Sequence, residues 1–401
     1  MSDKSTGWRK YRSPGLLAGK LRERGVTGAG RILLKYVRQG LDRPTKPVRV
    51  KLWGVIDNIR FNQLNVMKSR DVLYAFYDLE VSNVSFDIID FLALAELQRR
   101  ESGCSSLHVV IVPGSDEGFR PGNSSYDTEH KRWRLRNIVV PACGLIPACQ
   151  GVTICTSRQE AQALMSSLAK RVFPKGYGAR HPIRNSYSFK HVVAAKARGA
   201  AIPSIQATPE ARRHVSDWIQ KNADGRKVIT VTLREASFRP DRNSDLGAWG
   251  AFIRSLDRDV YFAVVVRDIE TANQPLPPEL NGAKPFSDAI WNMELRAAIC
   301  ELSYLNMFVN TGPGELCIMN RHTRYLLFKM RPWFPSDEAF QHSFRGKGIE
   351  PGSQFVTATP FQRVVWEDDT IEVISEAFRD MCERIEGSVV STRESGALST
   401  T

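Results

Sequence analysis

Residues 71–114, DVLYAFYDLEVSNVSFDIIDFLALAELQRRESGCSSLHVVIVPG, carry the pattern that decides the fold class. The apolar, β-rich run 71–79 predicts a buried strand. Residues 88–97 have apolar side chains at helical spacing, and Gly103 follows as a residue that favours the end of a helix. The apolar run 106–114 predicts a second strand, closed by Pro-Gly. A strand, a helix and a strand in so short a stretch form a βαβ unit, so we expect a parallel sheet.

The same alternation of strands and helices continues to the end of the chain. We therefore expect an α/β protein of two Rossmann-like parallel-sheet domains, residues 71–206 and 207–386, which face a cleft. Residues 172–206 are rich in Gly, Pro and Arg and are expected to connect the domains, and 387–401 are expected to be a disordered tail. The remaining predicted strands are 151–156, 228–233, 260–266, 305–309 and 325–329, and the remaining helices are 133–147 (with a loop), 157–170, 208–222, 246–256, 287–302 and 370–385.

Size and composition indicate a soluble protein with room for two cores. The chain has 401 residues, of which 42% are hydrophobic and 25% charged. No apolar run reaches the roughly 18–20 residues of a transmembrane helix, and the N-terminus lacks the apolar region of a secretory signal. The seven cysteines are scattered without CxxC or zinc-ligand spacing, which predicts reduced thiols in a cytoplasmic protein and no metal site.

The positive charge is confined to the N-terminus. Residues 1–70 hold 17 of the 56 Lys and Arg but 4 of the 43 acidic residues, and the rest of the chain holds 39 of each sign. A neutral body argues against nucleic-acid binding. Apolar residues at helical spacing lie among the basic ones, so residues 1–70 are expected to be a basic, partly helical extension. It either lies on an anionic membrane surface, packs on the body or stays solvated.

Three arginines follow the predicted strand 228–233, in a loop that leads into a helix. Arg234, Arg239 and Arg242, with Asn243, suit a diphosphate, because guanidinium groups pair with phosphate oxygens in bidentate fashion. The alternative is a surface loop in which arginines and aspartates pair with one another. No GxSxG, P-loop or GxGxxG motif occurs, so hydrolases, P-loop NTPases and dinucleotide enzymes lack their signatures here.

A turn of small residues, NTGPGELCIMN at 310–320, follows the predicted strand 305–309. Glycines let a backbone approach a ligand closely, and a threonine hydroxyl can donate to a phosphate, although Gly-Pro-Gly is also a good turn in its own right. Its place at a strand's carboxyl end, in the same half as the arginine loop, makes it a candidate wall of a donor site. The candidate residues in it are Asn310, Thr311, Gly312, Gly314 and Glu315.

Acidic residues at the end of the first strand are candidates for catalysis. Asp78 or Glu80 is positioned to face an acceptor and to act as general base, unless these residues only organise the turn before the next helix. The acidic run 367–369 precedes the last helix, where it complements the helix dipole rather than predicting a metal site.

The C-terminal half resembles a known family of folds. The segments VTLREASFRPDRNSDLGAW (231–249), VYFAVVVRD (260–268) and ELRAAICELSYLNMFVNTGPGELCIMN (294–320) resemble the donor-binding domain of GT-B glycosyltransferases over about 225–386. The arginine loop is similar in layout to that of the fucosyltransferase-like branch but lacks its HxRRxD form. The turn resembles the DTGP turn of the heptosyltransferase family, with Asn310 in place of Asp and Gly314-Glu315 in place of Met-His.

The resemblance implies a metal-independent glycosyltransferase, hexosyl or related. It would move a sugar from a nucleotide-diphosphate sugar, without a further cofactor, to a glycan or lipid-linked acceptor in surface-polysaccharide assembly. The arginine loop and the turn would hold the donor diphosphate, and the enzyme would be cytoplasmic, with peripheral attachment to the inner face of the membrane through 1–70 as one alternative. Two other functions stay open: a noncatalytic GT-B-like partner in a glycan-assembly complex, and a sugar-nucleotide epimerase of two-domain build.

Overall fold

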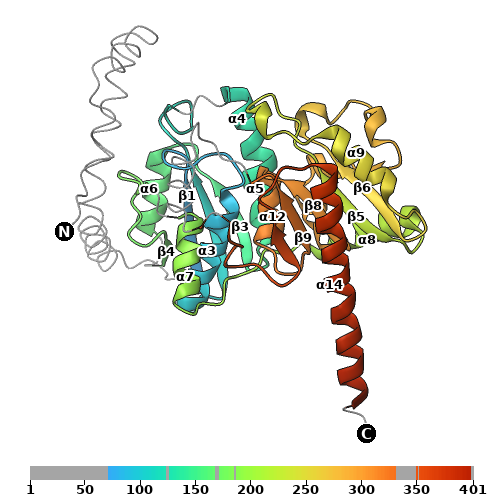
Figure 1. Ribbon diagram of the computed structural model, residues 1–401. Coiled ribbons are helices and arrows are strands. Elements are labelled where there is room, and N and C mark those ends of the chain that lie inside the picture. The colour runs from blue at the N-terminus through green and yellow to red at the C-terminus, as the bar shows by residue number, and fades with distance from the viewer. Residues whose placement is uncertain are drawn as a thin grey trace, which may run out of the picture.

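The computed structural model describes residues 71–122, 126–167, 171–184, 187–330, 349–350 and 352–398. Its strands form two sheets, one of four strands and one of six, and every strand pair in both is parallel. The sheets lie side by side, with helices α5 (Val140–Ala142) and α12 (Glu315–Ile318) between them (Figure 1). The expected α/β fold with two parallel sheets is therefore confirmed. The predicted basic extension, residues 1–70, lies outside the described residues.

The first sheet has the strand order β3-β2-β1-β4. β1 and β2 pair in register from Val72 and Ser106 to Asp78 and Val112. Alternate side chains of β1 enter different cores, Phe76 with helix α6 and Tyr77 with helix α3. The bounds are β1 Val72–Asp78, β2 Ser106–Val112, β3 Cys149–Ile154, β4 Val172–Phe173, α3 Ile88–Glu101, α4 Thr128–Arg134, α6 Arg158–Ser167 and α7 Phe189–Ala197, with a π-helical turn Leu135–Val139 and a 3₁₀ turn Cys143–Leu145 between α4 and β3.

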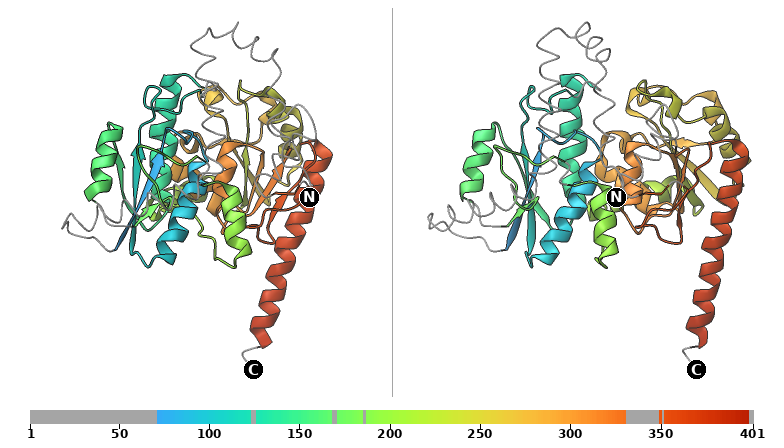
Figure 2. Two further views of the ribbon diagram at one scale, coloured as in Figure 1. Left: turned by 90° about the vertical axis from the view of Figure 1, so that its left-hand side faces the viewer. Right: turned by 60° about the vertical axis from the view of Figure 1, so that its left-hand side comes forward.

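The second sheet has the strand order β10-β9-β8-β5-β6-β7. Its central strands are almost entirely buried and rich in Val, Ile and Leu, as expected of a parallel sheet covered on both faces. Helices α9 and α14 cover one face, and α8 and α11 the other (Figures 1 and 2). The bounds are β5 Lys227–Thr232, β6 Tyr261–Val266, β7 Lys284–Pro285, β8 Leu305–Val309, β9 Tyr325–Phe328, β10 Gln362–Val364, α8 Pro209–Ala223, α9 Leu246–Ser255, α10 Asp288–Trp291, α11 Met293–Leu302 and α14 Ile371–Leu398.

Helices of the second unit begin at the side-chain caps that the sequence supplies. Thr208 accepts a hydrogen bond from the backbone N–H of Ala211 (3.3 Å), and Pro209 occupies the first helical position of α8. Asp245 caps α9 in the same way through Ala248 N (3.0 Å). These caps fix where each helix starts, and so fix how the preceding loops leave the sheet.

Three sequence-based expectations differ from the structure. The presumed connector 172–206 contributes β4, which pairs with β1, and α7, which packs on the core of the first unit. The single helix expected over 287–302 is two helices, because Asn292 has an extended backbone and caps α11 through Glu294 N and Leu295 N. Residues 387–398 of the presumed disordered tail continue α14 to Leu398, since each residue added to an existing helix gains a hydrogen bond without a new nucleation cost.

The two units share a hydrophobic core. One cluster of buried side chains includes Leu73 and Tyr77 of the first sheet and Val264 and Phe308 of the second. A backbone hydrogen bond also crosses between the units, from Ile205 N to the Met319 carbonyl (3.1 Å). Burial of this kind fixes the relative placement of loops that leave the two sheets. None of the helices in the described part of the chain has the length and apolar character needed to span a membrane.

Candidate functional site

A cavity of about 420 Å³ lies between the two units, where loops leave the carboxyl ends of β1, β5, β6 and β8. This is where ligands bind in open parallel sheets, so the cavity is the candidate functional site. Its lining comes from both units: Asn83–Asp87, Tyr126, His130, Trp133, Arg134, Asn137 and Ile138 from the first, and Leu233, Arg234, Ala236, Phe238, Arg242, Asp268–Glu270, Ala289, Ile290, Met293, Arg296, Asn310–Pro313 and Glu315 from the second.

The loop after β5 is organised around the buried guanidinium of Arg234. This group donates to the Arg239 carbonyl (2.9 Å), the Phe238 carbonyl and the Asn243 side-chain oxygen. Asn243 in turn holds Ala236 through that same oxygen and through its amide nitrogen (3.0 Å). Arg234 therefore lines the cavity but already uses much of its donor capacity to shape the loop. Asn243 lies outside the lining and acts on the loop's backbone.

Arg239 does not line the cavity. Its backbone is in the left-handed region (φ 57°), and its side chain pairs with Asp241 at 2.9 Å. The sequence analysis left open that arginines and aspartates of this loop pair with one another, and Arg239 and Asp241 do so. The ion pair with Asp241 raises the pKa of Arg239 and lowers the pKa of Asp241.

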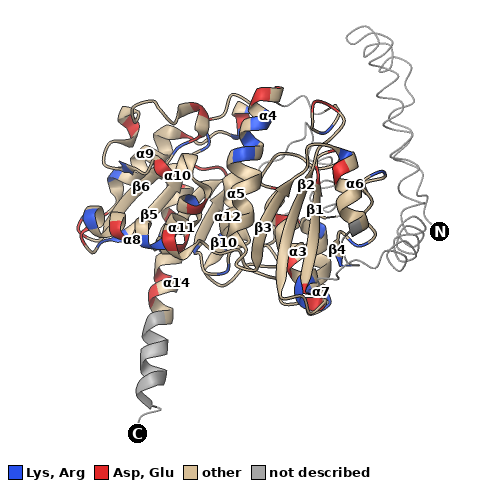
Figure 3. Ribbon diagram, turned by 180° about the vertical axis from the view of Figure 1, so that it is seen from behind, with Lys and Arg blue, Asp and Glu red and all other residues tan. Residues whose placement is uncertain are grey.

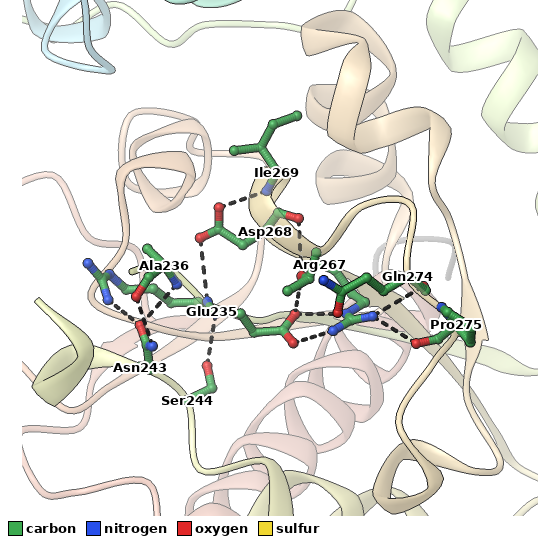
Figure 4. A network of polar contacts seen from close by, with 11 residues as sticks. Glu235, Ala236, Asn243, Ser244, Arg267, Asp268, Ile269, Gln274 and Pro275 are labelled. Atoms are coloured by element: carbon green, nitrogen blue, oxygen red, sulfur yellow. Dashed lines mark hydrogen bonds and ion pairs between the residues drawn. The ribbon is translucent and has the colours of Figure 1, made fainter. Parts of the chain in front are cut away.

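A buried ion pair ties the loop after β5 to the loop after β6 (Figure 4). The guanidinium of Arg267 donates to the carboxylate of Glu235 (Nε to Oε2, 2.8 Å), and the Thr271 hydroxyl donates to the same carboxylate (2.9 Å). Arg267 also donates to the carbonyl of Pro275 (3.0 Å). Two cavity walls are thereby held at a fixed separation by groups that lie outside the cavity lining themselves.

Two buried arginines of the second unit face the cavity. Arg242 is 7% exposed and donates from Nη2 to the Asn310 carbonyl (2.7 Å), which joins the arginine loop to the turn after β8. Burial, reinforced by the positive charges of Arg234 and Arg239, lowers the pKa of Arg242 to about 10. A guanidinium in such surroundings gains strongly from a bound anion.

Arg296 is the second of them, and the sequence analysis did not single it out. It lies in the first turns of α11, is 9% exposed, and lines the cavity. Within the described parts of the chain its side chain forms no hydrogen bond or ion pair, and burial lowers the pKa of its guanidinium. A buried charged group without a partner lowers the stability of the fold. Its presence at the cavity therefore favours a role in binding an anion. An arginine at helical spacing among apolar residues gave no sequence signal for this placement.

The turn after β8 contributes Asn310, Thr311, Gly312 and Glu315 to the cavity wall, while Gly314 lies behind it. Neither glycine has a positive φ. A Cβ on Gly312 would lie 2.8 Å from the ring of Phe86, and one on Gly314 would lie 2.7 Å from the ring of Phe308. Both positions therefore exclude a side chain for packing reasons. The close approach at Gly312 brings the turn against the first unit.

Asp78 and Glu80, the expected catalytic residues, do not line the cavity. The Asp78 carboxylate is 2% exposed and accepts two hydrogen bonds from Arg158 (2.8 Å each) and one from the Tyr177 hydroxyl (2.6 Å). Glu80 accepts from the backbone N–H of Ser115 (2.7 Å). Both carboxylates organise the loops behind the site, because these partners occupy them.

The carboxylate that the first unit presents to the cavity is Asp87. Asp87 is exposed and holds the N-cap position of α3, but its side chain makes no capping hydrogen bond. Its carboxylate appears in no ion pair or hydrogen bond with the described residues, and its backbone N–H donates to the Ser85 hydroxyl (3.4 Å). The available sequence signal was the polar segment after β1, which places acidic residues near the carboxyl edge of the first sheet. It does not indicate that Asp87, rather than Asp78, lines the cavity.

Helix α4 of the first unit forms one rim of the cavity with aromatic and basic side chains, and the sequence analysis missed it. Tyr126, His130, Trp133 and Arg134 all line the cavity. Arg134 donates to the Val84 carbonyl (2.7 Å), and its guanidinium lies 4.6 Å from the centre of the Tyr126 ring. The spacing of three and four residues in YDTEHKRWR (126–134) was the available signal, since such residues share one face of a helix.

Within the described residues, no three His, Cys, Asp or Glu side chains gather in a way that could hold a metal ion. All seven cysteines are free thiols. Burial raises the pKa of several of them, including that of Cys155 to about 11.

Comparisons with known proteins give similarities of overall structure. No family model matches the chain, and no curated protein sequence matches it at a significant level. Among solved structures, the chain is similar to a glycosyl transferase family 9 protein from Veillonella parvula, with a TM-score of 0.46, 11% identity, and coverage of 79% of this chain and 99% of that one. It is also similar to the ADP-heptose LPS heptosyltransferase II of E. coli, with a TM-score of 0.47, 9% identity, and coverage of 80% and 100%. Identities this low say nothing about the substrate of this chain.

Proposed function

We propose that this protein is a glycosyltransferase that moves a sugar from a nucleotide-diphosphate sugar to a glycan or lipid-linked acceptor. One observation carries the proposal. One cavity is lined by two buried arginines of the second unit, Arg242 and Arg296, and by Asp87 of the first unit. The Asp87 carboxylate makes no capping hydrogen bond to its helix. An anion site from one unit and a candidate base from the other, in one cavity, are what the transfer of a group from a diphosphate to a hydroxyl requires.

The second unit would bind the donor. The diphosphate would lie against Arg242 and Arg296, with the Thr311 hydroxyl and the Gly312 backbone beside it. Charge-assisted hydrogen bonds to phosphate contribute about 1.5–3 kcal/mol each. Arg234 supports the same wall by fixing the loop that carries Arg242.

The reaction is a displacement at the anomeric carbon. Asp87 takes the proton from the acceptor hydroxyl, and the hydroxyl oxygen forms a bond with the anomeric carbon. The bond from that carbon to the diphosphate oxygen breaks, and its electron pair leaves with the nucleoside diphosphate. Arg242 and Arg296 stabilise the charge that develops on this leaving group, so their contribution is largest in the transition state.

In this proposal guanidinium groups neutralise the leaving diphosphate, and no divalent cation takes part in the step. Full activity in the presence of EDTA is therefore expected, and loss of activity that added Mg²⁺ or Mn²⁺ restores would contradict this part of the proposal. The donor sugar is proposed to be a hexose or a related sugar. The setting is surface-polysaccharide assembly in the cytoplasm, with residues 1–70 as a candidate contact to anionic lipid.

The test uses the full chain and a panel of nucleoside diphosphates and their hexose and heptose conjugates. Isothermal titration should show binding of at least one nucleoside diphosphate, and Arg242→Ala should weaken it. Arg239→Ala should leave it unchanged, because Arg239 pairs with Asp241 outside the cavity lining. Mass spectrometry then identifies the product of the bound conjugate.

Each alternative predicts a different result. A noncatalytic partner protein binds none of the panel. A sugar-nucleotide epimerase returns a conjugate of unchanged mass with the nucleotide still attached. A glycosyltransferase releases the free nucleoside diphosphate, with the sugar passing to water in the absence of an acceptor, so either of the other outcomes contradicts the proposal.

A further inference from the structure

Four aromatic side chains form a continuous strip from the cavity to the protein surface. Tyr126 and His130 have ring centres 4.5 Å apart, His130 and Trp133 6.1 Å, and Trp133 and Trp291 6.3 Å. The first three rings line the cavity, and Trp291 ends the strip with 45% of its surface exposed. We call these four residues the aromatic strip.

The aromatic strip crosses from one unit to the other. Tyr126, His130 and Trp133 belong to α4 and its approach, whereas Trp291 is the last residue of α10 in the second unit. Figure 3 shows α4 on the same side of the molecule as α10. A ligand on the strip would therefore contact both units at the mouth of the cavity.

The two tryptophans form the outer end of the strip. The rings of Trp133 and Trp291 meet at 82°, edge to face, so they do not stack face on face. At the inner end the guanidinium of Arg134 lies over Tyr126. The exposed ring of the strip is thus Trp291, at the end away from the arginine that lies over the inner ring.

We propose that the aromatic strip binds the acceptor as a chain of uncharged pyranose residues. This inference rests on the proposed function. The C–H groups on one face of a pyranose are weakly positive, and they pack on the negative face of an indole ring. A strip that continues outward to an exposed tryptophan suits an oligomer whose terminal hydroxyl enters the cavity and whose other residues extend outside.

A polar group beside the strip adds hydrogen-bonding capacity for sugar hydroxyls. Asn137 lines the cavity one helical turn beyond Trp133, and its amide nitrogen donates to the Trp133 carbonyl (2.8 Å). That bond fixes the amide's orientation. The amide oxygen has no hydrogen-bond partner in the described residues, so it can accept from a hydroxyl. An aromatic face with a fixed amide beside it favours a saccharide over an apolar ligand.

The test measures saccharide and nucleotide binding separately on the full chain. The probes are linear hexasaccharides of glucose, mannose and galactose, followed by saturation-transfer NMR, and nucleoside diphosphates, followed by titration calorimetry. Trp291→Ala should weaken hexasaccharide binding about tenfold, as expected for the loss of one aromatic contact. It should leave nucleoside diphosphate affinity unchanged, and Trp291→Phe should retain most of the saccharide binding.

Ile154→Ala is the matched control, because Ile154 is 50% exposed and lies on β3, outside the cavity lining. The inference is overturned if the wild-type protein binds a nucleoside diphosphate but none of the hexasaccharides. It is also overturned if Trp291→Ala weakens nucleotide binding instead, since that result would mean that the nucleotide base stacks on the aromatic strip. Failure of the wild-type protein to bind any nucleoside diphosphate would instead overturn the proposed function. The wild-type measurement does not depend on whether a variant folds.

Discussion

Replacing Arg296 with Met should stabilise the free protein and weaken diphosphate binding in the same variant. The Arg296 side chain is 9% exposed and has no hydrogen-bond or ion-pair partner among the described residues. Methionine keeps most of the apolar stem and its packing while it removes the buried charge. The free energy of unfolding should therefore rise, whereas the affinity for the diphosphate should fall.

The two magnitudes follow from general energetics. A buried polar group without a partner costs about 1–3 kcal/mol, so the free energy of unfolding should rise by an amount in this range. Each kcal/mol raises Tm by about 2–4 °C for a domain of this size. Loss of one charge-assisted hydrogen bond to a phosphate costs about 1.5–3 kcal/mol, which weakens nucleoside diphosphate binding by about 10- to 150-fold.

Arg267→Met is the matched control for this prediction. Arg267 is equally buried, at 5% exposure, but pairs with Glu235. Removing it leaves a buried carboxylate without its partner, which should lower the free energy of unfolding by about 3–5 kcal/mol. Urea unfolding and titration calorimetry on both variants provide the measurement. The reasoning is refuted if Arg296→Met destabilises the protein as Arg267→Met does, or if it leaves diphosphate affinity at the wild-type value.

Three other variants separate catalysis, packing and support of the site. Asp87→Asn should lower kcat by about 10²–10⁴-fold with nucleotide affinity unchanged, because it removes the proposed base; a loss in affinity instead would contradict that role. Gly312→Ala should destabilise the protein by about 1–3 kcal/mol, since its Cβ would lie 2.8 Å from the Phe86 ring, and Phe86→Leu in the same chain should recover part of the loss in thermal melts. Asp78→Asn should lower the free energy of unfolding by about 3–5 kcal/mol by breaking the pair with Arg158, whereas kcat per folded molecule should stay near wild type; a selective loss of kcat would restore Asp78 as a catalytic candidate.

The elements of the fold were largely predictable because they depend on local pattern. The continuous apolar runs at β1, β2, β5, β6 and β8 predicted buried parallel strands, and all five are present near the expected bounds. Short elements were missed. β4 has two residues and forms only because β1 offers it an unpaired edge, which no local signal reveals.

The candidate site was predictable at the level of loops but not of individual side chains. The carboxyl ends of parallel strands converge by geometry, and residues of the arginine loop and of the turn after β8 both line one cavity. Which arginine faces inward depends on the path of the loop. Arg239, which has a left-handed backbone, pairs with Asp241 and does not line the cavity, whereas Arg242, at the end of the following 3₁₀ turn, lines it and donates to the Asn310 carbonyl.

The sequence by itself therefore determined the two parallel sheets and the edge of the sheet at which the candidate site lies, because the hydrophobic pattern of each element and the alternation of strands and helices along the chain are encoded locally. The tertiary structure decided which charges remain available there. Asp78 forms an ion pair with Arg158. Asp87 and Arg296 line the cavity, although they lie more than 200 residues apart in the chain. Burial and pairing are properties of the packed chain, and they distinguish a structural charge from a functional one.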